Sequence, residues 1–386
     1  MKLLIISARF PEYGYKGDQL RVRQLVELLS PEHELHVITG SRPSGPTALA
    51  ELQRLAQLTV IDAGRLARAL ATLGQLSRGR PAELGWMAPR RLRKLARDAA
   101  EANDAVIAST VRVVTGPFLA PLIIDHIDAL SANMRERAAL ERNLLISLAA
   151  RIEARLLARH ERRVAGWAAA QVTVCAADAA SLPQSPRPIV IPHVALQAAE
   201  TGAGGSAGMQ PGRDIDVIFT GNMNYPPNRD AARWLAEAIV PELQLLRPNT
   251  SVLVAGRRAQ TLSLNGVEVA GDVPDLAALL CRARVAIAPL RGGTGVPNKL
   301  LEAAAAGAAI VATPRPASAA AVAALTATDA PGLAAAVARL LDDNALREDL
   351  AARARADLAP RAPSTVAAQL TSVLVLAVRD TGQAPS

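Results

Sequence analysis

The chain has 386 residues, of which 50% are hydrophobic and 20% are charged, a balance typical of a folded protein rather than a disordered one. This length predicts two domains, because a single core rarely extends beyond about 250–300 residues. The formal net charge is +8, but aromatic residues make up only 2% of the chain, so the stacking residues of RNA-binding proteins are scarce. We therefore expect no nucleic acid partner, and we assign the charge to phosphate-bearing substrates or an anionic membrane surface.

The first residues, MKLLIISARF, predict a buried strand, because their apolar run is too short for a signal peptide and lacks a small-residue cleavage site. No uninterrupted apolar run reaches the roughly 18 residues of a membrane span. Cys175 and Cys281 lie far apart without metal-ligand spacing, which favours free thiols in a reducing compartment. We expect a cytoplasmic protein, peripheral at the inner face of a membrane.

Short apolar runs alternate with helical patterns in the first half of the chain. A strand, a loop, the helical run QLRVRQLVELLS and a second strand form a β-α-β unit, which predicts a parallel sheet. A long Arg/Glu/Leu stretch over 131–170 predicts one or two helices. The strands that we expect lie at 2–8, 34–40, 105–109, 121–128, 171–176 and 188–194.

A glycine-rich stretch at 198–216 lacks apolar periodicity and predicts a linker, after which the alternation resumes. The expected fold is α/β, with two doubly wound domains over 1–200 and 215–360, a linker over 201–214 and a tail over 361–386 that packs back on the first domain. Ligands of such sheets bind beyond the carboxyl ends of the strands, so we expect the site in the cleft between the domains. The strands predicted here lie at 215–221, 251–256, 266–271, 285–290 and 309–313.

The stretch RGGTGVPNKLLEAAAAG (291–307) follows the strand VAIAPL and carries the strongest functional signal. Glycines let backbone N–H groups approach an anion, and the N-terminus of the following helix favours negative charge. Lys299 lies on the first turn, where it opposes the helix dipole unless a polyanion is bound, and Glu302 lies on the same face within reach of ribose hydroxyls. The pattern indicates a nucleotide site, and a glycine-rich turn followed by a solvated helix face is the alternative.

Several separate stretches then resemble one family in the right order. Residues 271–313 are similar to the donor half of retaining glycosyltransferases with the GT-B fold, in particular the family 4-like sugar transferases of bacterial exopolysaccharide systems. YKGDQLR (15–21) and FTGNMNYPPNRDAARWL (219–235) resemble two further motifs of that group, and 123–131 and 156–182 also resemble it. The resemblance covers most of the chain apart from 41–100 and the tail.

The resemblance implies two Rossmann-like domains of the GT-B fold, the first on the acceptor side and the second binding the nucleotide sugar. Glu302 would bind the donor ribose and Lys299 the diphosphate, with Lys299 also stabilising the leaving group. Arg257 is placed for a phosphate or base, or is a surface arginine. The remaining candidate donor contacts lie in the two glycine loops: Lys16, Gly17, Gly293, Thr294 and Gly295.

In the first domain the resemblance places His126 and Asp128 where a polar residue orients the transferred sugar, with a buried structural histidine as the alternative. Asp18 and Arg21 are candidates for the acceptor or sugar side, or else a helix cap and a solvated arginine.

The chain departs from many relatives at three places. Thr294 stands where a second glutamate is common, GNMNYPPN replaces the usual arginine and lysine that grip the diphosphate, and His193 replaces an Asn-Gly pair. No Asp-x-Asp motif stands at a strand end, so we expect no obligatory metal or other cofactor, with the nucleotide sugar as donor substrate.

The expected activity is transfer of a sugar, with retention, to a saccharide, lipid-linked or small-molecule acceptor. The segment 77–100 combines clustered Arg and Lys with Trp86 and leucines, and is either a contact to an anionic membrane or an ordinary solvated helix. A nucleotide-sugar epimerase of the same fold and a non-catalytic nucleotide-sugar-binding protein are the alternative functions.

Overall fold

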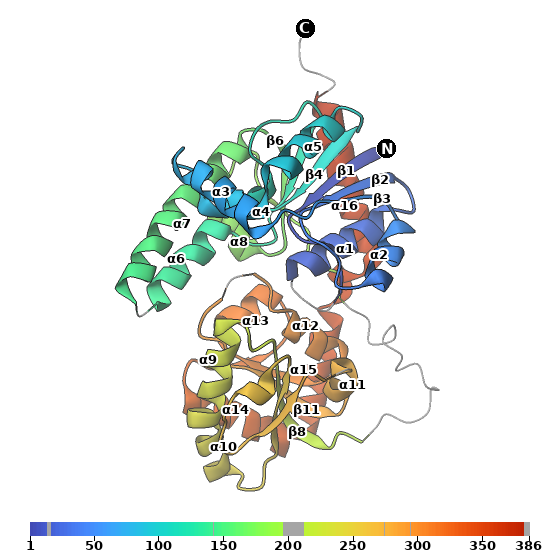
Figure 1. Ribbon diagram of the computed structural model, residues 1–386. Coiled ribbons are helices and arrows are strands. Elements are labelled where there is room, and N and C mark those ends of the chain that lie inside the picture. The colour runs from blue at the N-terminus through green and yellow to red at the C-terminus, as the bar shows by residue number, and fades with distance from the viewer. Residues whose placement is uncertain (14–16, 142, 196–211, 274, 294, 382–386) are drawn as a thin grey trace. The chain divides into compact units, whose positions relative to one another are not determined.

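The computed structural model describes residues 1–13, 17–141, 143–195, 212–273, 275–293 and 295–381 (Figure 1). The chain divides into two units, one of Met1–Val194 with Pro363–Ser386 and one of Ala195–Ala362. Residues 201–211 of the expected linker lie outside the described part of the chain.

The first unit contains a parallel sheet in the order β3-β2-β1-β4-β5-β6-β7. In the central strand β1, Leu3 and Ile5 belong to one buried cluster and Leu4 and Ile6 to another. Alternate residues therefore point to opposite faces of the sheet. Both faces are therefore covered, as in a doubly wound fold. The strands are β1 (Lys2–Ser7), β2 (Glu34–Thr39), β3 (Gln57–Val60), β4 (Ala105–Ser109), β5 (Leu122–Asp125), β6 (Ala168–Thr173) and β7 (Ile189–Val190).

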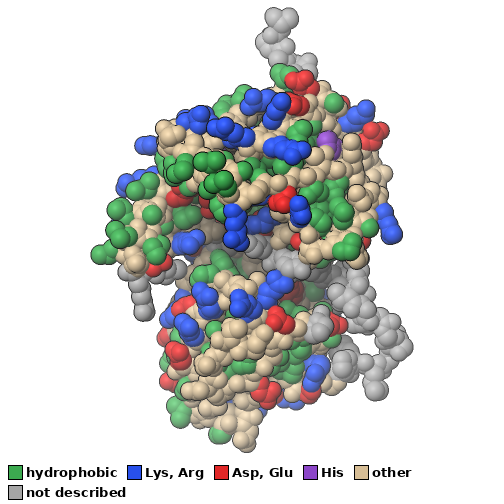
Figure 2. Space-filling model, in the orientation of Figure 1, with side chains coloured by type: hydrophobic (Ala, Val, Ile, Leu, Met, Phe, Trp, Pro, Cys, Tyr) green, Lys and Arg blue, Asp and Glu red, His purple; other side chains and the backbone are tan. Residues whose placement is uncertain are grey.

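Helices cover both faces of this sheet. One core cluster joins the strands to α1, α2 and α16, and the other joins them to α5, α6 and α7. Figure 2 shows exposed hydrophobic side chains gathered on this unit over α3, next to basic ones. The helices are α1 (Gly17–Leu29), α2 (Pro46–Gln53), α3 (Arg65–Leu76), α4 (Ala82–Met87), α5 (Arg90–Ala100), α6 (Leu130–Leu140), α7 (Leu144–Ala165), α8 (Ala176–Ser181) and α16 (Pro363–Thr381), with a 3-10 turn η1 (Val111–Val113).

The C-terminal helix belongs to the first unit. By length and composition alone, residues 344–379 could cross a membrane. Within that stretch α15 ends at Ala356 and α16 begins at Pro363. α16 buries Val366, Leu370 and Val373 in the core of the first unit, beside α1 and β6. The apolar residues of α16 therefore pack inside the protein.

The second unit contains a parallel sheet in the order β10-β9-β8-β11-β12-β13, so its architecture is also doubly wound and the expected α/β fold is confirmed. The strands are β8 (Ile215–Thr220), β9 (Val252–Gly256), β10 (Glu268–Gly271), β11 (Ala283–Ala288), β12 (Ala309–Ala312) and β13 (Leu325–Thr326).

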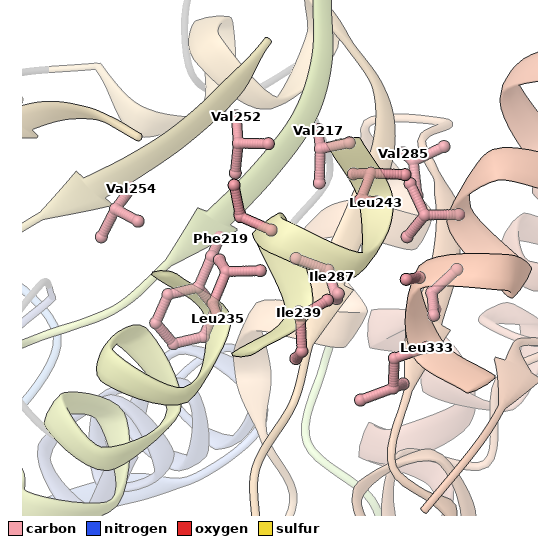
Figure 3. Close-up of a cluster of buried hydrophobic side chains, with 14 of the residues drawn as sticks. Val217, Phe219, Leu235, Ile239, Leu243, Val252, Val254, Val285, Ile287 and Leu333 are labelled. Carbon is pink, nitrogen blue, oxygen red and sulfur yellow. The ribbon is translucent and has the colours of Figure 1, made fainter. Parts of the chain in front are cut away.

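One face of this sheet packs against α9, α10 and α14, and Figure 3 shows Phe219 of β8 in that cluster with Leu235 and Ile239. The other face packs against α11, α12 and α13, largely through alanines. The helices are α9 (Pro226–Trp234), α10 (Val240–Leu246), α11 (Leu276–Cys281), α12 (Asn298–Ala305), α13 (Pro314–Ala320), α14 (Ala330–Asp342) and α15 (Asn344–Ala356), with a π-helical segment η2 (Leu235–Ile239) and 3-10 turns η3 (Ala259–Thr261) and η4 (Ala359–Arg361).

The structure adds elements that the sequence did not predict. β3 and β13 have four and two residues and lie at sheet edges, where a short strand leaves almost no periodic signal. The segment 41–76 also folds into α2 and α3, and 77–100, for which a solvated helix was one alternative, folds into α4 and α5. Helix α3 turns Leu66, Leu70 and Leu73 toward solvent, which hides the usual pattern of a core-facing helix.

Candidate functional site

Two neighbouring strands of the second sheet end in glycines that lie against each other. Gly256 closes β9 with φ +125°, a backbone conformation that favours glycine. A Cβ on Gly256 would lie 2.3 Å from the carbonyl oxygen of Gly221, which directly follows β8. The two strand ends therefore pack backbone to backbone, and side chains from elsewhere converge above Gly221.

The glycine loop is tied to the motif that follows β8. The Arg291 guanidinium donates to Asp230 of α9, with Nε 2.9 Å from Oδ2 and Nη2 2.5 Å from Oδ1. The same guanidinium lies over the Trp234 ring, 4.9 Å from its centroid. Gly293, at φ +118°, faces the Tyr225 hydroxyl. The structure thus brings together stretches 219–235 and 291–307, which the sequence analysis had treated as separate motifs.

Lys299 is the second residue of α12 and lies over the end of β8. Its Nζ donates to Oδ1 of Asn228 at 2.8 Å and lies 4.3 Å from the centroid of the Phe219 ring. The Nζ is so close to Gly221 that a Cβ there would lie 3.1 Å from it. Loss of solvation lowers the pKa of Lys299 to about 7, and the charge of Glu302 partly opposes that shift. An incoming anion would favour the charged ammonium.

Glu302 lies one turn further along α12 and is partly buried. Burial raises the pKa of its carboxyl, and the nearby Lys299 charge works in the other direction. On the first turn of the same helix, Oδ1 of Asn298 is buried without a hydrogen-bond partner among the described residues. Buried polar atoms are normally paired, so these groups are suited to a polar ligand.

Arg257 directly follows β9 and is exposed, as expected for a residue at the carboxyl edge of the sheet. Its carbonyl accepts from the N–H of Met223 at 2.9 Å, which ties the loop after β9 to the loop after β8. Arg258 beside it has φ +57° and donates to Oδ1 of Asn224 at 3.3 Å. The two loops therefore form one connected rim at this edge.

In the first unit, His126 and Asp128 follow β5 but differ in environment. His126 is 1% exposed, its Nε2 lies 2.8 Å from Oε1 of Gln171, and burial lowers its pKa to about 4. This neutral imidazole is held by the neighbouring strand β6, and these contacts match the structural alternative.

Asp128 is only partly buried and accepts from Nδ2 of Asn133 at 2.9 Å. Desolvation raises the pKa of its carboxyl to about 6, against the opposing charge of Arg112. Ile127 before it has φ +60°, and Thr110 at the end of the neighbouring β4 has φ +67°. Such strain in residues with a Cβ costs about 1–3 kcal/mol and tends to cluster at functional sites. Asp128 is therefore the stronger of the two candidates.

Arg21 and Asp18 of α1 have partners within the first unit. Arg21 is 1% exposed, and its guanidinium donates to Oδ2 of Asp125 and to the carbonyl of Pro192, each at 2.7 Å. Asp18 accepts from Arg9. The first arrangement secures α1 to β5, and the second ties its first turn to the loop after β1. The acceptor-side role of the two residues stays a prediction.

The sequence of the second unit is similar to a known family. Residues 214–343 match the model of the family described as Glycosyl transferases group 1. The match covers most of the second unit, Ala195–Ala362. No curated protein matches the sequence.

Solved structures extend the likeness over the whole chain. HepE from Anabaena in complex with UDP is 16% identical, with 97% of this chain and 100% of that chain covered and a TM-score of 0.65. WaaG, a glycosyltransferase involved in lipopolysaccharide biosynthesis, is 17% identical, with 96% of this chain and 100% of that chain covered and a TM-score of 0.60. A trehalose-phosphate synthase (UDP-forming) from Burkholderia xenovorans in complex with glucose-6-phosphate is 15% identical over 97% and 99%, with a TM-score of 0.63. These likenesses show the GT-B fold.

The sequence did not indicate the partners of Lys299. Asn228 and Gly221 belong to the quoted stretch 219–235, but nothing in the sequence connects them to a lysine 71 residues away from Asn228. Gly17 begins α1 and is exposed, whereas the predicted site residues Lys16 and Thr294 lie outside the described residues.

Proposed function

We propose that this chain is a hexosyltransferase that moves a sugar from a nucleoside diphosphate sugar to an acceptor. The observation that carries the proposal is the meeting of Lys299 and Asn228 beside the glycine loop, at the carboxyl edge of a glycosyl transferases group 1 domain. In open α/β sheets this edge is where ligands bind. HepE, which shares the fold, has been solved with UDP and with UDP-glucose, so UDP sugars are the first donors to test.

In this proposal Lys299 contacts the diphosphate and Glu302 accepts from the ribose hydroxyls. The half-buried ammonium stabilises the charge that develops on the leaving diphosphate as the glycosidic bond breaks. Asn228 holds the ammonium in place through its Oδ1. Arg257, on the rim formed by the neighbouring loop, supplies a second positive charge.

The leaving group would depart without a bound metal ion, because its charge is met by the protein's own cations and backbone. Among the residues that the structure describes, no group of three or more His, Cys, Asp and Glu side chains could hold a metal ion. We further propose that the transferred sugar keeps its anomeric configuration, and that Asp128 helps to orient it. The proposed acceptor is a saccharide, either small or linked to a lipid.

Incubation of the full chain with UDP-, GDP- and dTDP-sugars and a panel of saccharide acceptors tests this function. Release of the nucleoside diphosphate together with a product of increased mass supports it, and the anomeric proton coupling of that product reports retention or inversion. Lys299→Met should abolish release, whereas Lys2→Met, at an exposed lysine of the first unit, should leave it unchanged. Binding of a donor without release across all acceptors would instead favour a non-catalytic binding protein.

A further inference from the structure

Helix α3 presents its leucines to solvent. Leu66 is 74% exposed, Leu70 is 60% and Leu73 is 62%, and these positions share one face of the helix. The residues turned toward the protein are small or polar instead, with Ala71 6% and Gln75 2% exposed. This amphipathic helix is therefore inverted relative to an ordinary surface helix, whose apolar face packs on the core.

The contacts of α3 fix this orientation. Arg68 donates from Nη1 to the carbonyl of Trp86, from Nη2 to that of Gly40 and from Nε to that of Ala63, at 2.5, 2.5 and 3.0 Å. On the same side, α4 packs so closely that a Cβ on Gly85 would lie 2.3 Å from the backbone of Thr72. Rotating the leucines inward would break these contacts, so the exposed face is a fixed feature of the fold.

The net charge of the protein is concentrated in the segment that contains this helix. Residues 65–97 hold nine of the 43 Lys and Arg residues and only one of the 35 Asp and Glu residues, namely Glu83. The segment therefore carries a formal charge of +8, and the remainder of the chain is neutral overall. Glu83 is paired with Arg112, with Oε2 2.6 Å from Nε, which leaves no unpaired carboxylate in the segment.

The basic residues lie close together in the fold as well as in the sequence. Burial is the main cause that lowers the pKa of Arg93, and the charges of Arg90, Arg80, Arg78 and Arg97 lower it further. The turn after α3 and helix α5 therefore form one basic cluster. Arg90, Arg91 and Lys94 of α5 are exposed. Figure 2 shows basic side chains next to the hydrophobic ones over α3.

We propose that this face docks on an anionic lipid bilayer, with Leu66, Leu70 and Leu73 inserted into the interface and the basic cluster set against the headgroups. An amphipathic helix flanked by basic residues supplies the two signals that stable peripheral binding needs. Charge also distinguishes this occupant from a second copy of the chain. A symmetric dimer would set the same +8 segment against itself, and like charges across an interface are unfavourable.

Sedimentation of the full chain with vesicles tests the proposal, and it does not depend on any sugar transfer. Vesicles of phosphatidylcholine with 30% phosphatidylglycerol would be compared with pure phosphatidylcholine at low and high salt. We expect saturable binding to the anionic vesicles that weakens as salt rises, because screening removes the headgroup attraction. No binding to anionic vesicles at low salt would overturn the proposal.

Two variants separate the contribution of the exposed leucines from that of the basic residues. Leu70→Ser/Leu73→Ser should weaken vesicle binding by about tenfold or more while the salt dependence remains, because the apolar contribution is lost. Arg90→Gln/Arg91→Gln/Lys94→Gln should weaken it by about fivefold for each charge and flatten the salt dependence. The matched control is Leu245→Ser/Leu246→Ser on α10, where two other leucines are 79% and 55% exposed and binding should not change.

Equal weakening by the α10 control and by the α3 variant would overturn the proposal, because it would show a non-specific apolar effect. Light scattering supplies a second overturning outcome. If the α3 substitutions convert a dimer to a monomer and the wild type does not bind vesicles, the face is an interface between copies of the chain.

Discussion

The side chains of Lys299 and Asn228 meet across the carboxyl edge of the second sheet, with Nζ 2.8 Å from Oδ1, although the residues stand 71 positions apart. The contact joins the first turn of α12 to the first turn of α9. It holds a half-buried ammonium over the Phe219 ring beside the glycine loop. The hydrogen bond and the ring contact of this cation are both made with neutral groups, so neither of them neutralises the charge that an incoming diphosphate would meet.

Asn228→Ala should weaken donor binding by about fivefold, since one hydrogen bond that positions the ammonium contributes about 1 kcal/mol. Asn228→Asp should weaken it by more than about tenfold, because a carboxylate would compete with the diphosphate for Lys299. Calorimetric titration with UDP-glucose measures both. The control is Asn344→Ala at the exposed start of α15, which should not change binding. If neither Asn228 variant changes the affinity for UDP-glucose, Asn228 does not belong to the donor site.

Donor binding should also depend on pH through Lys299, whose pKa lies at about 7. The ammonium is charged below that pH and neutral above it, and only the charged form attracts the diphosphate. Affinity should therefore fall by about tenfold between pH 6 and pH 8, with a proton taken up on binding at the higher pH. UDP-glucose is the suitable ligand because its diphosphate is diesterified and does not titrate in this range.

The variant Lys299→Arg is the control for this pH dependence, because a guanidinium stays charged throughout the range. Its affinity should be lower but nearly flat with pH. A wild-type affinity that is equally flat would show that Lys299 does not contact the diphosphate.

The two glycines at the strand ends should respond differently to alanine. Gly256→Ala forces a Cβ to within 2.3 Å of the Gly221 carbonyl oxygen at φ +125°, and we expect a loss of about 2–4 kcal/mol in the free energy of unfolding. Gly221→Ala brings a Cβ to 3.0 Å from Asn228 and 3.1 Å from Lys299 Nζ, which a small shift can relieve. It should fold normally but bind the donor more weakly. Urea unfolding and calorimetry separate the effects, and equal stability of the two variants would contradict this reasoning.

Much of the fold could be predicted from the sequence, because buried parallel strands such as Lys2–Ser7 and Ala283–Ala288 are apolar runs between helical patterns. The loop around Lys299 was also recognisable, since glycines, a lysine and a glutamate follow a strand in order. The position of Asn228 was not, because a contact over 71 residues depends on how two loops pack. The burial of charged side chains could not be predicted either. Arg21 resembles a solvated helix residue in the sequence but is 1% exposed in the fold.

The buried pair of Arg21 and Asp125, 2.7 Å apart and 1% and 2% exposed, should matter for stability rather than for donor binding. Arg21→Met leaves an uncompensated buried carboxylate and should cost about 3–5 kcal/mol in the free energy of unfolding, and Arg21→Met/Asp125→Leu should recover part of that loss. Arg42→Gln is the control, because its pair with Asp62 is exposed and should contribute less than about 1 kcal/mol. Urea unfolding measures all three, and a double variant less stable than Arg21→Met would contradict this assignment.

The central claim is that the carboxyl edge around Lys299 binds a nucleoside diphosphate sugar, and calorimetric titration of wild type and Lys299→Met with UDP-, GDP- and dTDP-sugars tests it most directly. We predict saturable binding of at least one donor by the wild type and an affinity about 30-fold or more lower in the variant, since a charged hydrogen bond to phosphate contributes about 2 kcal/mol or more. Equal affinity of the two proteins, or no binding of any of these donors by the wild type, would contradict it.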